Sequence, residues 1–287
     1  MNKIACPVCL GENFKHFCQK DDMEVVICQK CQLIFTNPQL NRTEIREHYD
    51  KNYYYSPKKE KTDRSRYFDY NKNYLEGDGL KRFKIIFERL ENIKPAKGRI
   101  LDVGAATGFF VKEASNRGWN AEGIEISHWA VDYARKSLHQ KMHCGDLASL
   151  GHEKSAFDVI VMNDVLEHVE NPLKEVKLAA KLLKKDGLLF IETINFDNFI
   201  TRNIIGKNYV HMVPKFHLFY FGRHQLRDIL AKAGFEILEE TLWSSSVGDY
   251  KETGWKMYWR YFLLLFSQKL PENLAVNDVI KIYAKKC

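Results

Sequence analysis

The sequence predicts an α/β fold in which a mostly parallel sheet of seven strands carries helices on both faces. Two observations support this prediction. From Arg99 onward, short apolar segments alternate with amphipathic segments of helical period. Residues 99–110 read as a buried strand, a tight turn bracketed by Gly104 and Gly108, and the start of a helix. A ligand of such a sheet is expected beyond the carboxyl ends of its strands.

Four cysteines at the beginning of the chain form two C-x-x-C pairs, Cys6 with Cys9 and Cys28 with Cys31. Two tight turns of this kind present four thiolates to one Zn²⁺, and four protein ligands leave no open position, so the predicted zinc is structural. Short strands are expected at 24–27 and 33–36, and residues 37–38 (Asn-Pro) end the module. Residues 1–38 are therefore predicted to form a zinc ribbon. Cys18 lies between the two pairs and could also be a ligand.

Residues 39–95 are polar, rich in tyrosine and mostly helical in pattern, and they predict a connecting or lid segment. Its last part carries an apolar stripe of helical period from Leu80 to Leu90 that leads into the first core strand. Tyr53, Tyr54 and Tyr55 are candidates for lining a substrate pocket, although tyrosine clusters more often serve packing.

Residues 96–287 form the predicted α/β domain. We expect its strands at 99–103, 121–126, 142–146, 157–162, 188–193, 235–243 and 278–284, and helices at 128–138, 172–183 and 223–233. Residues 244–276 are expected to be a helical insertion. An apolar stripe at 255–270 leaves three interpretations open, namely core packing, a homodimer interface, or contact with a membrane surface.

The glycine turn excludes two common nucleotide sites. A G-x-G-x-x-G fingerprint counted from Gly104 would need glycine at Ala106 and Phe109, and the chain has no G-x-x-x-x-G-K-[ST] segment. Residues 102–108 instead resemble motif I of the class I S-adenosylmethionine (AdoMet) methyltransferases, acid-x-Gly-x-Gly-x-Gly. Ala106 takes the place of the middle glycine, and one methyl group still permits a close approach to the backbone.

Other segments resemble the same family in order along the chain. Glu125 closes the second strand, where the family's acid binds the ribose hydroxyls, and Asp146 closes the third, where the family reads the adenine amino group. Residues 163–172 and 214–235 resemble segments of small-molecule methyltransferases. Residues 28–38 resemble the zinc-bearing start of bacterial methyltransferases from sugar and polysaccharide gene clusters.

This resemblance implies a Rossmann-like methyltransferase fold, AdoMet as cofactor and S-adenosylhomocysteine as its product. It also implies a set of cofactor-binding residues at the carboxyl ends of the first four strands: Asp102, Gly104, Ala105, Ala106, Thr107, Gly108, Phe109, Glu125, Ile126, Asp146, Leu147, Asn163 and Asp164.

The chemistry of an AdoMet enzyme lies largely in the cofactor, whose methyl group is already electrophilic, so the protein mainly aligns the acceptor. An oxygen or carbon acceptor also needs a base of near-neutral pKa. We expect His168 to be that base, with Glu167 orienting it or contacting the substrate. His217 is the second candidate for the base, and His211 is a candidate for the acceptor pocket.

Composition restricts the acceptor only loosely. The net charge of +7 permits an anionic partner without requiring nucleic acid. Residues 163–166 (Asn-Asp-Val-Leu) do not match the pattern of enzymes that methylate amino groups of DNA bases. A small molecule is therefore expected, and the resemblance implies a nucleotide-linked or lipid-linked sugar or another glycan precursor in carbohydrate biosynthesis. The alternatives are an RNA methyltransferase whose ribbon binds nucleic acid, and a non-catalytic AdoMet-binding scaffold.

The expected location is the cytoplasm. The sequence begins without the apolar core of a signal peptide, and no stretch approaches the roughly 18 apolar residues of a membrane-spanning helix.

Overall fold

A computed structural model of the chain describes residues 2–40, 44, 79–151, 154–209, 211–243 and 277–287. The chain divides into two compact units. One unit contains residues 1–40, 164–177 and 191–284, and the other contains residues 41–163, 178–190 and 285–287. Most of the connecting segment, Tyr53 to Tyr55 within it, and the expected insertion at 244–276 with its apolar stripe lie outside the described residues.

The second unit holds the first strands of the predicted sheet. Its complete elements are α4 (Gly79–Ile93), β4 (Arg99–Val103), α5 (Phe109–Asn116), β5 (Asn120–Glu125), α6 (His128–Ser137), β6 (Met142–Cys144), the 3₁₀ turn η1 (Leu147–Leu150) and β7 (Phe157–Asn163). β4 pairs in parallel with β5 and with β7, and β5 pairs in parallel with β6. Because the three pairings are parallel, the carboxyl ends of these four strands lie at one edge of the sheet.

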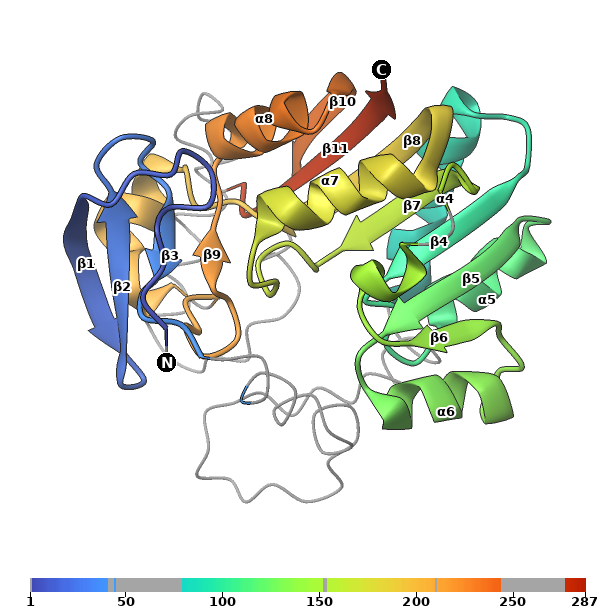
Figure 1. Ribbon diagram of the computed structural model, residues 1–287, viewed down its shortest axis with the longest axis horizontal. Coiled ribbons are helices and arrows are strands. Elements are labelled where there is room, and N and C mark those ends of the chain that lie inside the picture. Colours follow the sequence, from blue (N-terminus) through green and yellow to red (C-terminus); the bar gives the residue numbers. More distant parts are fainter. Residues whose placement is uncertain (1, 41–43, 45–78, 152–153, 210, 244–276) are drawn as a thin grey trace, which may run out of the picture. The chain divides into compact units, whose positions relative to one another are not determined.

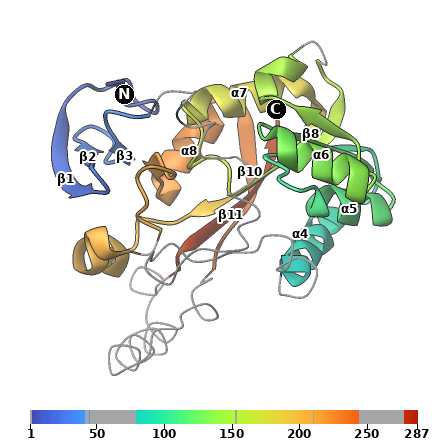
Figure 2. The ribbon, with the colours of Figure 1, turned by 90° about the horizontal axis from the view of Figure 1, so that it is seen from below.

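Burial explains why these segments are strands and helices. Val159, Ile160 and Val161 of β7 are fully buried, as expected for a central parallel strand covered on both faces. The apolar stripe of α4 faces α5, where Phe87 stacks on Phe110 with ring centroids 4.6 Å apart. Figure 2 shows these two helices side by side. The predicted stripe is therefore a buried face from Phe83 to Leu90, whereas Leu80 at its start is exposed.

The first unit contains the ribbon and the later part of the chain. Its elements are β1 (Phe14–Lys20), β2 (Met23–Cys28), β3 (Ile34–Thr36), η2 (Ile200–Ile205), η3 (Gly206–Asn208), β9 (Phe219–Tyr220), α8 (Arg223–Lys232) and β10 (Phe235–Trp243). β1, β2, β3 and β9 form an antiparallel four-stranded sheet in that order, seen in Figure 1. The ribbon is thus completed by a strand that lies nearly two hundred residues further along the chain.

Three elements have residues in both units, namely α7 (Pro172–Leu182), β8 (Leu183–Ile194) and β11 (Val279–Lys286). The large sheet has seven strands in the order β10-β11-β8-β7-β4-β5-β6, which confirms the predicted α/β class. The predicted elements agree with the observed ones within a few residues at most boundaries. Expectation and structure differ at β1 and at the two-residue strand β9, neither of which was predicted from the sequence. None of the described helices is long and apolar enough to cross a membrane.

Candidate functional site

The glycine turn after β4 adopts the left-handed backbone that its sequence requires. Gly104, Ala106 and Gly108 have φ angles of 68°, 47° and 83°. A Cβ on Gly108 would lie 2.8 Å from the Cβ of Ala134, so only glycine lets α5 begin this close to α6. The turn therefore exposes backbone at the start of a helix, where a ligand can approach it closely.

Ala106 is the residue that departs from the motif, and its positive φ indicates strain. A left-handed backbone costs an L-residue about 1–2 kcal/mol, whereas glycine adds about 0.4–1 kcal/mol of unfolded-state entropy. Ala106→Gly is therefore expected to raise the free energy of unfolding by ~0.5–1 kcal/mol in urea titrations without AdoMet. Ala105→Gly is the matched control, because Ala105 is not among the residues with positive φ, and it should not stabilise the protein. Equal effects of the two substitutions would contradict the strain.

Three polar side chains meet at the carboxyl edge of this sheet. Asp102 lies one residue before the end of β4, Glu125 is the last residue of β5 and Asn163 is the last residue of β7. A small pocket opens beside them and is lined by Phe83, Asp102, Gly104, Ala105, Phe109, Phe110 and Asn163. The structure thus brings the acid, the turn and the first residue of the helix to one place, as predicted.

The two carboxyl groups influence each other. Asp102 and Glu125 are each only 5% exposed. Burial, and then the negative charge of Glu125, hold the pKa of the Asp102 carboxyl well above its usual value. A ligand that places a positive charge beside Asp102 would relieve both effects. AdoMet carries two positive groups, the sulfonium and the α-ammonium.

Glu125 also stabilises the glycine turn of residues 104–108, here called the motif turn. Its Oε2 accepts the N–H of Ala106 at 3.0 Å, and its Oε1 accepts the N–H of Ser127 at 2.9 Å. A carboxylate has about four lone-pair positions, so its two oxygens can accept more than these two bonds. The binding of a ribose by Glu125 stays a prediction.

The remaining predicted cofactor residues lie at or near the same edge within this unit, except Asp164, which begins a segment of the other unit. Asp146 is the N-cap of η1 and accepts the N–H of Ser149 at 3.2 Å. Leu147 is buried and Ile126 is partly exposed. Asp164 is exposed and has a φ of 55°. Their predicted contacts with the cofactor stay predictions.

The residues around the pocket fit AdoMet. They offer carboxylates for its positive groups and hydroxyls, aromatic rings for its adenine, and a glycine turn for close approach. In addition, the Thr107 hydroxyl is fully buried and has no hydrogen-bond partner among the described residues. An orphaned hydroxyl in the turn suits a ligand that supplies the missing partner.

Removing the Glu125 carboxylate is expected to weaken binding of S-adenosylhomocysteine by about 10–150-fold. This range corresponds to the ~1.5–3 kcal/mol of hydrogen bonds to charged groups. Glu125→Ala can be measured by calorimetry against Asp132→Ala, which removes an exposed acid of α6 that pairs with Lys136. The control should bind like the parent. Unchanged affinity in Glu125→Ala would contradict the assignment.

The predicted catalytic residues form a cluster in the other unit. The His168 and His217 rings lie 4.8 Å apart in an edge-to-face arrangement, and the His211 ring stacks 6.1 Å from that of His217. We call these three residues the histidine cluster. Glu167 is 1% exposed beside it, and its carboxylate accepts the Thr193 hydroxyl at 2.8 Å.

Backbone carbonyls fix the protonation pattern of two of these imidazoles. Nδ1 of His168 lies 2.9 Å from the Phe216 carbonyl, and Nδ1 of His217 lies 2.8 Å from the His211 carbonyl. A carbonyl only accepts, so each Nδ1 carries hydrogen, and in the neutral ring Nε2 carries the lone pair. Each imidazole is thereby oriented as a proton acceptor.

The surroundings favour the neutral rings. Burial lowers the pKa of His168, although the Phe216 carbonyl and the charge of Asp164 act against it. Burial, followed by the charges of His168 and His211, lowers the pKa of His217 further. Both rings are therefore in the neutral form, with Nδ1 protonated and Nε2 unprotonated, at neutral pH. A general base must be in this form. A candidate metal-binding group is also present here. It consists of one ligand atom from each of Glu167, His168 and His217, and these three atoms lie within 4.8 Å of one another, close enough for one divalent cation to bind all of them.

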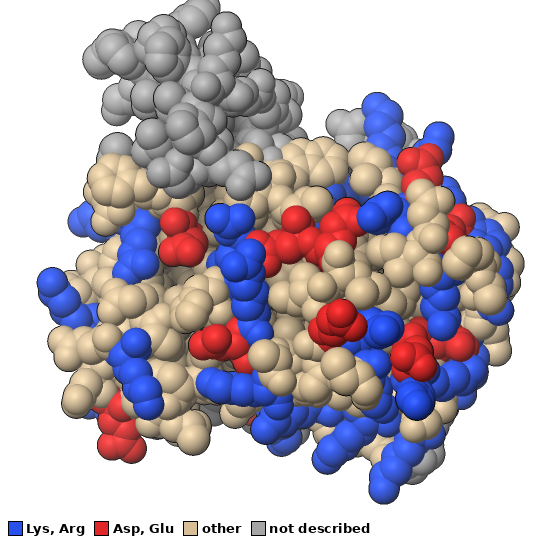
Figure 3. All heavy atoms as spheres, turned by 90° about the horizontal axis from the view of Figure 1, so that it is seen from above, with Lys and Arg blue, Asp and Glu red and all other residues tan. Residues whose placement is uncertain are grey.

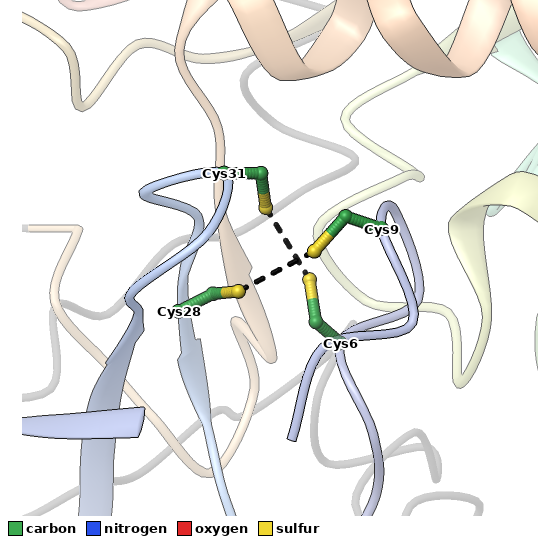
Figure 4. Close-up of side chains that lie close together, drawn as sticks. All are labelled: Cys6, Cys9, Cys28 and Cys31. Carbon is green, nitrogen blue, oxygen red and sulfur yellow. Dashed lines mark hydrogen bonds between the residues drawn. The ribbon is translucent and has the colours of Figure 1, made fainter. Parts of the chain in front are cut away.

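The four cysteines of the ribbon converge as predicted, and Figure 4 shows their sulfur atoms pointing toward one another. Cys6 Sγ lies 3.4 Å from Cys31 Sγ, Cys9 Sγ lies 3.4 Å from Cys28 Sγ, and all four sulfurs lie within 4.8 Å of one another. Zn–S bonds of about 2.3 Å in a tetrahedron place sulfurs about 3.8 Å apart. The donor set and its spacing fit Zn²⁺.

The two cysteine turns share one geometry. Cys6 N–H donates to the Gly11 carbonyl and Leu10 N–H to the Cys6 carbonyl; likewise Cys28 N–H donates to the Leu33 carbonyl and Gln32 N–H to the Cys28 carbonyl. Leu10 and Gln32 both have positive φ. Two turns unrelated in their other residues thus have the same hydrogen bonds, as a pair of metal-binding knuckles requires.

Cys18 lies outside this group. It is buried in an apolar cluster with residues such as Val25, Ile34 and Phe196, so its interpretation as a ligand is not supported by the structure. Thr193, the hydroxyl partner of Glu167, could not be predicted from the sequence, because a single threonine in a strand carries no signal of its contacts.

Comparison with known proteins decides the family. The methyltransferase-domain family matches residues 78–240, more than half of the chain. The chain belongs to this methyltransferase family. The class I AdoMet-dependent methyltransferase predicted from the motif is therefore confirmed, and the scaffold alternative is not needed.

Curated relatives and solved structures agree with this membership. The methyltransferase is 30% identical over 161 residues to a protein of Coxiella burnetii named ubiquinone biosynthesis O-methyltransferase, covering 53% of this chain and 64% of the relative. A protein of the same name from Actinobacillus pleuropneumoniae is 31% identical over 147 residues, covering 47% and 60%. The match thus spans less than two thirds of these relatives.

The fold is shared with solved structures. A methyltransferase from Archaeoglobus fulgidus aligns with a TM-score of 0.54 and 17% identity, covering 77% of this chain and all of the other. One from Mesorhizobium loti aligns with a TM-score of 0.51 and 14% identity, covering 74% and 100%. The resemblance to enzymes of sugar gene clusters stays a prediction.

Proposed function

We propose that this methyltransferase transfers the methyl group of AdoMet to an oxygen atom of a small-molecule acceptor, with His168 as general base. Two observations support the proposal, each within one unit: a pocket suited to AdoMet in one, and two imidazoles oriented as proton acceptors in the other. The names of the curated relatives, both O-methyltransferases, support oxygen as the accepting atom.

When bound, AdoMet supplies an electrophilic methyl group on a sulfonium. Asp102 and Glu125 would hold its charged groups and hydroxyls, and the motif turn would let it approach the backbone. Nε2 of His168 would take the proton from the acceptor oxygen, and Nδ1–H would stay bound to the Phe216 carbonyl. Glu167 and Thr193 would fix the position of His168 and its neighbours.

The four ribbon cysteines would hold one structural Zn²⁺ in this proposal. Four thiolate ligands close the coordination shell, so the metal supplies no open position for substrate. The cation-binding geometry at Glu167, His168 and His217 gives a second possible role for these residues, which added Mg²⁺ or Mn²⁺ in the assay would reveal.

The acceptor class is the least constrained part of the proposal. The sequence resemblance suggests a sugar hydroxyl as the methyl acceptor. The names of the curated relatives suggest a phenolic hydroxyl instead. A proton must leave in both reactions, so the same base serves either one. Figure 3 shows acidic side chains among the basic ones over the middle of the face in view, and basic side chains gathered along its lower edge. The RNA alternative is therefore tested directly in the assay.

The experiment is an assay with methyl-labelled AdoMet and two acceptor panels, nucleotide sugars and catechols with polyprenyl side chains. Label should enter one panel and S-adenosylhomocysteine should form in equal amount. Transfer to RNA, with neither panel methylated, would overturn the proposal in favour of the RNA alternative.

A further inference from the structure

The ribbon and the histidine cluster belong to the same compact unit, and one strand pair joins them. β3 of the ribbon pairs with β9, with Ile34 opposite Tyr220 and Phe35 opposite Phe219. The rings of Phe35 and Phe219 also stack, with centroids 6.1 Å apart. Because β9 begins two residues after His217, the ribbon binds the chain directly beside this histidine.

Thr36 extends this contact past the strand. It is fully buried, and its N–H donates to the Leu218 carbonyl at 2.9 Å. Its hydroxyl lies 3.3 Å from the Pro214 carbonyl and 3.5 Å from the His217 carbonyl, and it can donate its one hydrogen to either. Thr36 therefore contacts the backbone before His217, at His217 and after it.

The same backbone segment holds His168. Leu218, which binds Thr36 through its carbonyl, donates its N–H to the Glu167 carbonyl at 2.7 Å. The Phe216 carbonyl accepts Nδ1–H of His168. Residues 216–218 are thus bound by Thr36 on one side and by Glu167 and His168 on the other. A shift of this segment would move both imidazoles.

The cysteine turn leads directly into the strand that carries Thr36. β2 ends at Cys28 and β3 begins at Ile34, so the second cysteine pair forms the turn of this hairpin. Gln225 of α8 donates its side-chain N–H to the Cys31 carbonyl at 2.8 Å in a buried bond. A metal bound to this turn would therefore fix the end of the hairpin that holds the histidine segment.

We propose that Thr36 is a positioning residue, through which the metal-bound ribbon sets the backbone that orients His217 and His168. The ribbon is then part of the acceptor-side machinery and not an appended module. The catalytic consequence rests on the proposed role of the histidines, whereas the positional claim can be tested without any acceptor.

The test compares three variants of the metal-loaded, full-length protein. Thr36→Val removes the hydroxyl and keeps the shape, and Thr36→Ser restores the hydroxyl. Thr201→Val is the matched control, because Thr201 is equally buried in the same unit and its hydroxyl has no partner among the described residues. The readout is the nitrogen NMR signature of the histidine rings, which reports the tautomer, together with amide exchange at residues 214–219.

Thr36→Val should disturb the Nδ1–H signature of His217 and speed amide exchange at 214–219 by about 2–12-fold, the effect of losing one hydrogen bond. Thr36→Ser should restore both, and Thr201→Val should change neither. Unchanged ring signals and exchange in Thr36→Val, or equal changes in Thr201→Val, would overturn the proposal.

Metal removal gives a second measurement that does not depend on a folded variant. Chelation of the parent should speed exchange at 214–219 as well as at 1–37, and should leave 99–126 unchanged. Exchange that rises only at 1–37 would overturn the coupling. Titration with S-adenosylhomocysteine in the same samples tests the proposed cofactor separately, so the two failures are distinguishable.

Discussion

Replacing Cys28 with serine is expected to abolish retention of Zn²⁺ and to lower the free energy of unfolding by about 4 kcal/mol or more, the size that accompanies loss of a structural metal. Cys28 Sγ lies 3.4 Å from Cys9 Sγ, and the residue forms the corner between β2 and β3. Three thiolates bind zinc with lower affinity than four. Without the metal, the turn between β2 and β3 is no longer linked to the first cysteine pair. Metal analysis and urea unfolding of protein purified without chelator measure both effects.

Cys18→Ser is the control for this prediction, because Cys18 is buried in the same module but packs among apolar side chains. It should keep one zinc per chain. Full zinc content in Cys28→Ser, or loss of zinc in Cys18→Ser, would contradict the assignment of the four ligands.

Replacing His168 with glutamine is expected to lower kcat by about 10²–10⁴-fold, the usual contribution of a general base. Affinity for AdoMet should stay nearly unchanged, because the pocket residues lie on other elements. His224→Gln is the control, since His224 has a side chain that is 70% exposed and pairs with Asp228. If His217→Gln loses activity while His168→Gln stays within a few-fold of the parent, the base is His217.

The pH dependence follows from the lowered pKa of His168. The rate of the parent should rise with pH with a midpoint below the ordinary histidine value of about 6.5, because the neutral ring is the active form. His168→Gln should lose this rise. The lowered pKa of His168 also affects folding stability. Its contribution is present above pH ~6.5 and is lost as pH falls toward the folded-state pKa, because in this range the unfolded chain binds more protons than the folded chain.

Much of the cofactor pocket could be predicted from the sequence because its residues are local. The strand, turn and helix at 99–110 follow one another along the chain, and Glu125 comes at the end of the next strand. Parallel pairing then brings these carboxyl ends together. The four cysteines were predictable for a similar reason, since their spacing describes two turns directly.

The links between these parts could not be predicted because they depend on distant contacts. β9 has only two residues, and its pairing with β3 joins positions 34–35 to 219–220. Thr36 and Thr193 are ordinary strand residues in the sequence, and only the fold shows that they bind the backbone around His217 and the carboxylate of Glu167. The strand β1 was missed because most of its side chains are exposed or half-buried and polar.

The central claim is that AdoMet binds beside Asp102 at the motif turn. The most direct test is calorimetric titration of the parent with AdoMet over a series of pH values from about 5 to 8, each in two buffers of different ionisation enthalpy. A cation bound there should lower the raised pKa of Asp102, so one AdoMet per chain should bind, and protons should be released at pH values between the bound-state and free-state pKa of this carboxyl. No saturable heat, or binding whose heat is the same in both buffers at every pH, would contradict this account.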